Sequence, residues 1–169
     1  MTATKIKQEV TASDGSKLDL VRVSDVPMEA INWLWPGRIA KGKISLIAGH
    51  PGLGKSQVTI SIAATVSRGG LWPVDDVPAE AGNVVFLSAE DDVADTLKPR
   101  LIASGADTER IEVIQSVRDH NRPRMFSFTA DLDKLQQLKA DLLIIDPITA
   151  YLGDVDSHNN ADIRSVLAP

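Results

Sequence analysis

The stretch that decides the expected fold is ISLIAGHPGLGKS, residues 44–56. Within it, residues 49–56 match the pattern G-x-x-x-x-G-K-[ST] at every fixed position. The apolar run at residues 44–48 predicts a strand before the glycines. Apolar residues at every fourth position from Val58 to Val66 predict a helix after them. Strand, glycine-rich loop and helix in this order are typical of a phosphate-binding loop, or P-loop.

The residue types in this loop suit a nucleotide. Glycines let backbone N–H groups curl around phosphates, and the helix that follows adds its positive N-terminal end. Lys55 is expected to reach the β- and γ-phosphates and to take part in catalysis, and Ser56 to offer its hydroxyl to magnesium. We therefore expect ATP with Mg²⁺ as the ligand. The expected binding residues are Gly49, His50, Pro51, Gly52, Leu53, Gly54, Lys55, Ser56 and Gln57, of which His50 and Leu53 fill variable positions.

A carboxylate at the end of a second apolar run completes the expected magnesium site. Residues 142–145 are apolar at every position, as in a parallel strand buried on both faces, and Asp146 closes them. A carboxylate placed there usually holds magnesium through water. The alternative is that Asp146 is a turn or cap residue, because Pro147 follows it.

Acidic residues also follow the strand-like residues 83–88. Functional side chains gather at the carboxyl ends of parallel strands, so Glu90 is expected to orient or deprotonate an attacking water. The alternative for Glu90 is a simple helix cap. Asp91 and Asp92 are expected to cap the next helix, where the helix dipole favours negative charge.

Strands and helices alternate along the rest of the chain. A further strand is expected at residues 111–114, and helices at residues 93–101 and 132–138, with a last one beginning near Asn160. This alternation predicts an α/β fold, in which helices flank a parallel sheet.

The first 40 residues are expected to be a peripheral segment, and residues 41–169 the main domain. Strand-like runs flank Asp14-Gly15, which is a hairpin signal. Trp33 and Trp35 are expected to pack this segment onto the core. The alternative is that one of the two tryptophans borders the nucleotide base.

Composition narrows the possible functions. The 169 residues include no cysteine, which excludes disulfides, thiolate metal sites and cysteine nucleophiles. No apolar run approaches the ~20 residues that cross a bilayer, so a cytoplasmic protein is expected. The net charge of −5 argues mildly against nucleic acid, unless a local patch makes the contact. The one local basic cluster, residues 118–124, is expected to be a solvated loop, with a phosphate-contacting loop as the alternative.

Taken together, residues 49–56, 86–91 and 143–147 resemble the RecA-fold ATPases, and in particular the RepA-like group of plasmid, phage and prophage replication proteins. Residues 33–39 and 152–164 are similar to that group too. The resemblance implies that Glu90 is the catalytic carboxylate, and that the protein forms a homo-oligomeric ring, often hexameric, with ATP between subunits. It favours a helicase or translocase that acts on single-stranded DNA. A non-motor regulatory switch that assembles with protein partners is the alternative, and a small-molecule kinase fits less well.

The resemblance also predicts an incomplete core. The family continues past the tail helix into another core strand and into residues that complete a neighbour's site, whereas this sequence stops at Pro169. That strand would lie between residues 44–48 and residues 142–145. We therefore expect these two strands in one parallel sheet but not paired with each other, with an open groove or another chain between them.

Overall fold

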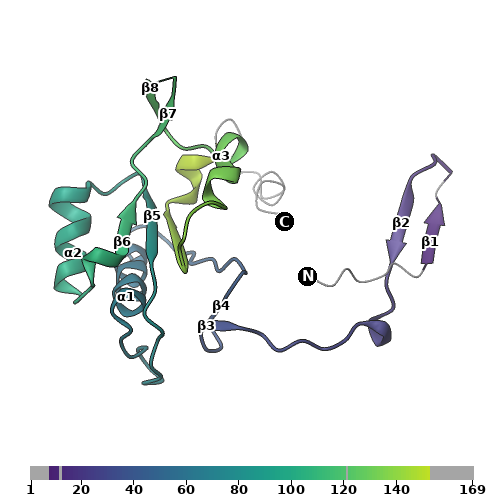
Figure 1. The fold of residues 1–169 in the computed structure, drawn as a ribbon, viewed down its shortest axis with the longest axis horizontal. Coiled ribbons are helices and arrows are strands. Elements are labelled where there is room, and N and C mark those ends of the chain that lie inside the picture. Colours follow the sequence, from purple (N-terminus) through teal and green to yellow (C-terminus); the bar gives the residue numbers. More distant parts are fainter. Residues whose placement is uncertain (1–7, 12, 121, 153–169) are drawn as a thin grey trace. The chain divides into compact units, whose positions relative to one another are not determined.

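The computed structural model describes residues 8–11, 13–120 and 122–152 of the chain, drawn as ribbons in Figure 1. The chain divides into two compact units, Met1–Asn32 and Trp33–Pro169, which are described separately. The first unit contains an antiparallel hairpin of β1 (Gln8–Thr11) and β2 (Lys17–Leu20), as the sequence predicts. Its turn is closed by Asp14, whose carboxylate accepts hydrogen bonds from the backbone N–H and the hydroxyl of Ser16, at 2.9 and 2.6 Å.

The second unit is built on a three-stranded parallel sheet in the order β6-β5-β9. The strands are β5 (Val84–Ser88), β6 (Ile111–Val113) and β9 (Leu142–Asp146). Four of the five residues of β5 are buried, because β5 is the central strand. The predicted α/β fold with a parallel sheet is therefore confirmed.

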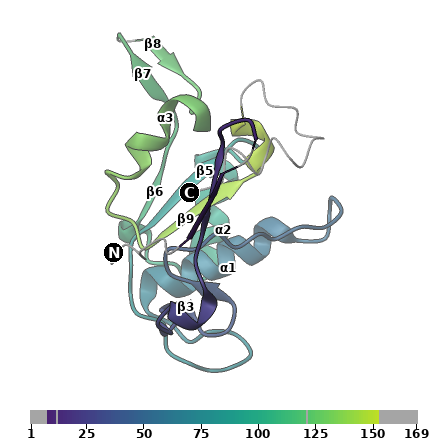
Figure 2. The same cartoon turned by 90° about the vertical axis from the view of Figure 1, so that its right-hand side faces the viewer.

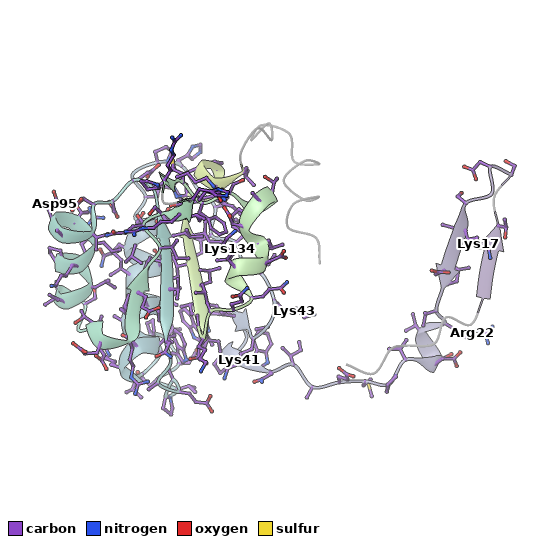
Figure 3. All side chains as sticks on the ribbon, turned by 45° about the horizontal axis from the view of Figure 1, so that its top comes forward. Lys17, Arg22, Lys41, Lys43, Asp95 and Lys134 are labelled. Atoms are coloured by element: carbon purple, nitrogen blue, oxygen red, sulfur yellow. The ribbon has the colours of Figure 1, made fainter. Side chains whose placement is uncertain are left out.

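Helices pack against this sheet, as Figures 1 and 2 show. The longest is α1 (Lys55–Arg68), which ends where Gly69 adopts a left-handed conformation with φ of 66°. A π-helical turn, η2 (Val93–Leu97), continues into α2 (Lys98–Ala103), with Asp95 on its outer side (Figure 3). The other helical segments are η1 (Val23–Asp25) in the first unit, and η3 (Thr108–Arg110), α3 (Phe128–Leu135) and η4 (Ile148–Tyr151) in the second.

The tryptophan-containing segment belongs to the second unit. It forms β3 (Trp33–Trp35), paired antiparallel with β4 (Ile39–Ala40). Trp35 stacks on the fully buried Trp72, with ring centroids 4.6 Å apart. Trp72 follows the C-terminal end of α1, whereas the P-loop precedes its N-terminal end. Trp35 therefore packs in the core, as predicted, and the alternative that it borders the nucleotide is not supported.

The basic cluster is a hairpin rather than a loop. Residues 118 and 119 lie in β7 (Val117–Asp119) and residues 122–124 in β8 (Arg122–Arg124), and the two strands pair antiparallel. Val117 at its base joins a second hydrophobic cluster with Leu87, Phe126, Phe128, Tyr151 and Leu152, separate from the main core under α1.

The predicted strand at residues 44–48 is wrong. This segment forms no strand, and Ile44, Leu46 and Ile47 are 68, 76 and 43% exposed. A parallel strand is stable only when backbone partners lie beside it, and no strand of the described residues flanks the free edge of β9. The two segments therefore do not share a sheet, and no backbone ladder joins them. The core of the described residues is thus an incomplete RecA-like sheet.

One further expectation differs from the structure, and another lies outside the described residues. In β9 only Ile144 is buried and the other four residues are partly exposed, because one edge of this strand has no neighbour among the described residues. The expected helix near Asn160 lies outside the described residues. None of the helices that the structure describes is long and apolar enough to cross a membrane.

Candidate functional site

The glycine-rich loop leads directly into the first turn of α1. Gly52 and Gly54 have φ of 79° and 83°, a left-handed conformation that side chains other than glycine rarely adopt. Gly54 is the residue before the helix, and no side chain caps the helix there. The first turn of α1 also contains no acidic residue. Its free N–H groups and positive dipole end are therefore available to an anion, which is the property that a phosphate site requires.

Lys55 is folded back over the loop. Its ammonium group donates hydrogen bonds to the backbone carbonyls of Gly49 and His50, both at 3.0 Å. These two carbonyls fix the position of the cation without neutralising it with a carboxylate. A phosphate in the loop would therefore meet a positively charged group that is already in place.

Ser56 and Asp146 line the same narrow cavity, although ninety positions separate them in the sequence. Ser56 lies in the first turn of α1, and Asp146 ends β9 next to Ser88, its partner in the β5–β9 ladder. Hydroxyl and carboxylate oxygens are the ligands that Mg²⁺ prefers. The side chains present therefore fit a magnesium ion. The cavity is lined by Ser56, Thr59, Ile60, Phe86, Ser88, Asp91, Leu97 and Asp146.

The acidic residues after β5 have three different environments. Glu90 is exposed and does not line the cavity, so the structure does not bring it together with Ser56 and Asp146. Asp92 accepts hydrogen bonds from the N–H groups of Ala94 and Asp95 at 2.7 and 3.1 Å. The prediction that Asp92 caps the helix is confirmed.

The same prediction for Asp91 is wrong. Its side chain lines the cavity and forms an ion pair of 3.0 Å with Arg100 of α2. Its backbone N–H donates to the Ser88 hydroxyl at 3.3 Å, which turns the chain back towards the end of β5. One residue is enough to cap a helix, so a run of three acidic residues leaves the sequence unable to say which one faces the cavity. An arginine nine positions further on, within the next helix, was the available signal.

A buried tyrosine lies behind the magnesium-ligand candidate. Tyr151 of η4 is 4% exposed, and its pKa is raised by burial and by the negative charge of Asp146. Tyr151 belongs to the second hydrophobic cluster, so the site is supported by packed side chains on this side.

A glycine-rich loop before a helix, a lysine held over it, and a carboxylate at the end of a parallel strand together define a P-loop ATPase. A family model described as an AAA domain (AAA_25) matches residues 11–169, which is nearly the whole chain. The protein therefore belongs to this family of AAA domains and is a nucleotide-binding ATPase of the P-loop class. No curated protein and no solved structure matches the chain.

Proposed function

We propose that this protein hydrolyses ATP to drive movement along single-stranded DNA, as a helicase or translocase in plasmid or phage-type replication. The observation that supports ATP hydrolysis is that Ser56 and Asp146 line one cavity, while Lys55, the neighbour of Ser56, is held over the glycine-rich loop. The similarity to RepA-like replication proteins supports the DNA-directed task. Assembly into a ring in the cytoplasm is part of the same proposal.

The residues divide the binding work. The backbone N–H groups of the loop hold the phosphate oxygens, and Lys55 balances the negative charge of the β- and γ-phosphates. Ser56 would hold Mg²⁺ directly, and Asp146 would hold it through water. A bound magnesium ion neutralises charge that develops on the phosphates.

Hydrolysis also needs a carboxylate that orients a water and accepts its proton. We assign this role to Glu90, which lies two residues beyond Ser88 of the cavity wall. Its exposed side chain is free to turn towards a phosphate. Asp91 supplies a second carboxylate at the cavity, fixed in position by Arg100. Its place makes it the next candidate for the same role.

The rate of ATP hydrolysis with and without single-stranded DNA tests the motor proposal. The comparison requires one stated salt concentration, because phosphate contacts weaken as salt rises. Stimulation by oligo(dT) is expected for a motor. A rate that oligo(dT) leaves unchanged would favour a non-motor regulatory ATPase, the function that the net charge of −5 suits better.

A further inference from the structure

The β7–β8 hairpin extends away from the sheet, beyond the end of β6 (Figures 1 and 2). Because β5, β6 and β9 are parallel, their carboxyl ends lie at the same edge of the sheet. The cavity residues Ser88 and Asp146 end two of these strands. The hairpin therefore emerges from the edge that also carries the nucleotide site.

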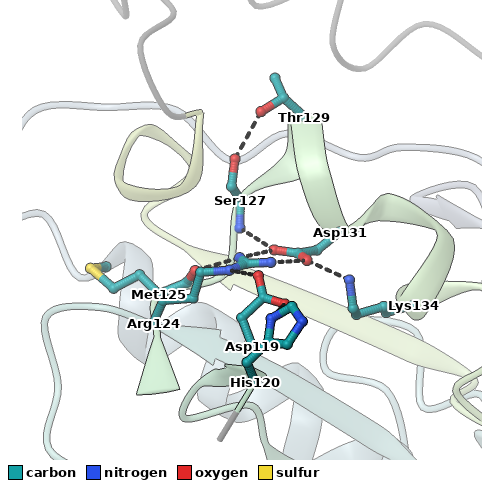
Figure 4. Close-up of polar contacts among 8 residues, drawn as sticks. All are labelled: Asp119, His120, Arg124, Met125, Ser127, Thr129, Asp131 and Lys134. Carbon is teal, nitrogen blue, oxygen red and sulfur yellow. Dashed lines mark hydrogen bonds and ion pairs between the residues drawn. The ribbon is translucent and has the colours of Figure 1, made fainter. Parts of the chain in front are cut away.

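An ionic network around the buried Asp131 fixes the hairpin to α3 (Figure 4). Arg124 of β8 donates two hydrogen bonds to the carboxylate of Asp131, at 2.6 and 2.8 Å. Asp131 is fully buried and also accepts from Lys134 at 2.6 Å and from the N–H of Ser127 at 3.0 Å. Arg124 reaches across the hairpin to Asp119 as well, at 3.1 Å. Paired and bidentate geometry of this kind holds the hairpin in one orientation.

The second hydrophobic cluster joins the base of the hairpin to the nucleotide site. Val117 of β7 is buried in it, and Phe126 makes edge-to-face contacts with Phe128 and Tyr151, at ring-centroid distances of 5.3 and 6.2 Å. Tyr151 belongs to η4, which follows Asp146 and Pro147. A shift of the end of β9 would therefore be passed to the hairpin through packed aromatic rings.

Within the described part of the chain, two arginines of the hairpin have no partner. Arg118 and Arg122 are exposed, and their side chains make no hydrogen bond or ion pair among the described residues. In the described part of the second unit, every other arginine is paired through its side chain with a carboxylate or a backbone carbonyl: Arg38, Arg68, Arg100, Arg110 and Arg124.

The four charged side chains of the network around Asp131 have no net charge, because the two carboxylates of Asp119 and Asp131 neutralise Arg124 and Lys134. The charges of Arg118 and Arg122 therefore remain as a positive excess on a chain whose net charge is −5.

We propose that the β7–β8 hairpin is an arm that contacts the phosphate backbone of single-stranded nucleic acid through Arg118 and Arg122. Guanidinium groups donate hydrogen bonds to phosphate oxygens with well-matched geometry. A hairpin that is already held in one orientation loses less conformational entropy on binding. The hairpin carries no Phe, Tyr or Trp, and the exposed His120 is its one aromatic side chain. Contacts to phosphate carry no base-sequence information, so the binding through Arg118 and Arg122 is independent of base sequence. This inference rests on the proposed DNA-directed function and names the surface that serves it.

The test is the salt dependence of binding to fluorescently labelled oligo(dT), measured by anisotropy between 50 and 200 mM NaCl. The variant is Arg118→Gln/Arg122→Gln, and the matched control Lys98→Gln/Lys139→Gln removes the same charge from exposed positions elsewhere whose side chains also make no ion pair among the described residues. Each lost phosphate contact lowers the slope of log K against log salt by about 0.7 for a single strand. The slope should therefore fall by about 1.4, so that the parent loses about sevenfold more affinity than the variant over this range. The control should keep the parental slope.

Three results would overturn the inference. The first is that the hairpin variant keeps the parental slope, and the second is that the parent does not bind oligo(dT) at 50 mM NaCl. The third is that polyglutamate displaces labelled oligo(dT) as readily as unlabelled oligo(dT) does. The last would assign the arm to an acidic protein instead. The binding assay does not depend on ATP hydrolysis, so the two proposals can fail separately. If the hairpin variant binds oligo(dT) more weakly but oligo(dT) does not change the rate of hydrolysis, the inference about the hairpin holds and only the motor proposal is refuted.

Discussion

Replacing Trp72 by alanine should strongly destabilise the second unit. Trp72 is fully buried and stacks on Trp35 with an interplanar angle of 6°. Arg38 lies over the other tryptophan, 5.0 Å from the ring centroid of Trp35. Removing a buried tryptophan costs about 3–5 kcal/mol, because the lost contacts and the residual cavity add. For a chain of this size that corresponds to a melting temperature lower by roughly 6–20 °C.

Replacing Trp72 by phenylalanine distinguishes the contribution of ring packing from the cost of burying the indole N–H. The indole N–H groups of Trp35 and Trp72 are both buried without a partner among the described residues. Removing one of them recovers about 1–3 kcal/mol of desolvation cost. The smaller ring buries less apolar surface. This lowers the free energy of unfolding by about 2 kcal/mol, at about 0.8 kcal/mol for each methylene-sized group. The two effects nearly cancel, so Trp72→Phe should lie within about 1.5 kcal/mol of the parent.

Urea denaturation followed by far-ultraviolet circular dichroism measures both variants, since tryptophan fluorescence itself changes with the substitution. The midpoints report stability if the m-values stay equal. A free energy of unfolding for Trp72→Ala within about 1 kcal/mol of the parent would refute the packing account. Equal losses for alanine and phenylalanine would show that the unpartnered N–H is not a cost.

Other predictions concern charged side chains. Hydrogen bonds from Arg124 and Lys134 hold the pKa of the Asp131 carboxyl below its ordinary value, although burial opposes them. Its stabilising contribution is therefore present above about pH 4 and is lost as the pH falls further. The stability difference between the parent and Asp131→Asn, measured in urea, should be constant near pH 7 and smaller at pH 3. An unchanged difference would contradict this. Glu90→Gln should keep ATP binding but lose hydrolysis, in preparations where the parent hydrolyses ATP. Parental turnover would transfer the base role to Asp91, whose Asp91→Asn variant should then be inactive.

Local sequence signals predicted the elements that need only local information. α1 was predictable because apolar residues recur at helical spacing and Gly69 ends the helix. β5 and β9 were predictable as apolar runs of strand length. The segment at residues 44–48 shows the same pattern, but a strand also needs a neighbouring strand, and a local run says nothing about that neighbour.

Pairing between side chains of neighbouring elements explains the residues that sequence reasoning missed. Asp91 was expected to cap a helix, and only the folded α2 brings Arg100 against it. Asp131 lies in a short helix and resembles an ordinary solvated acid. Its burial depends on Arg124, which a hairpin strand carries towards it from seven positions away. Side-chain partners of this kind follow from the fold rather than from a motif.

Binding of Mg²⁺–ATP to the parent and to Lys55→Ala, measured by calorimetry, tests the central claim most directly. Lys98→Ala, which removes an exposed lysine on α2, is the matched control, and circular dichroism verifies that each variant is folded. The parent and the control should bind Mg²⁺–ATP with equal affinity. Lys55→Ala should bind it at least about tenfold more weakly, a loss of at least about 1.4 kcal/mol. A folded Lys55→Ala with parental affinity would contradict the assignment of residues 49–56 as the phosphate-binding loop.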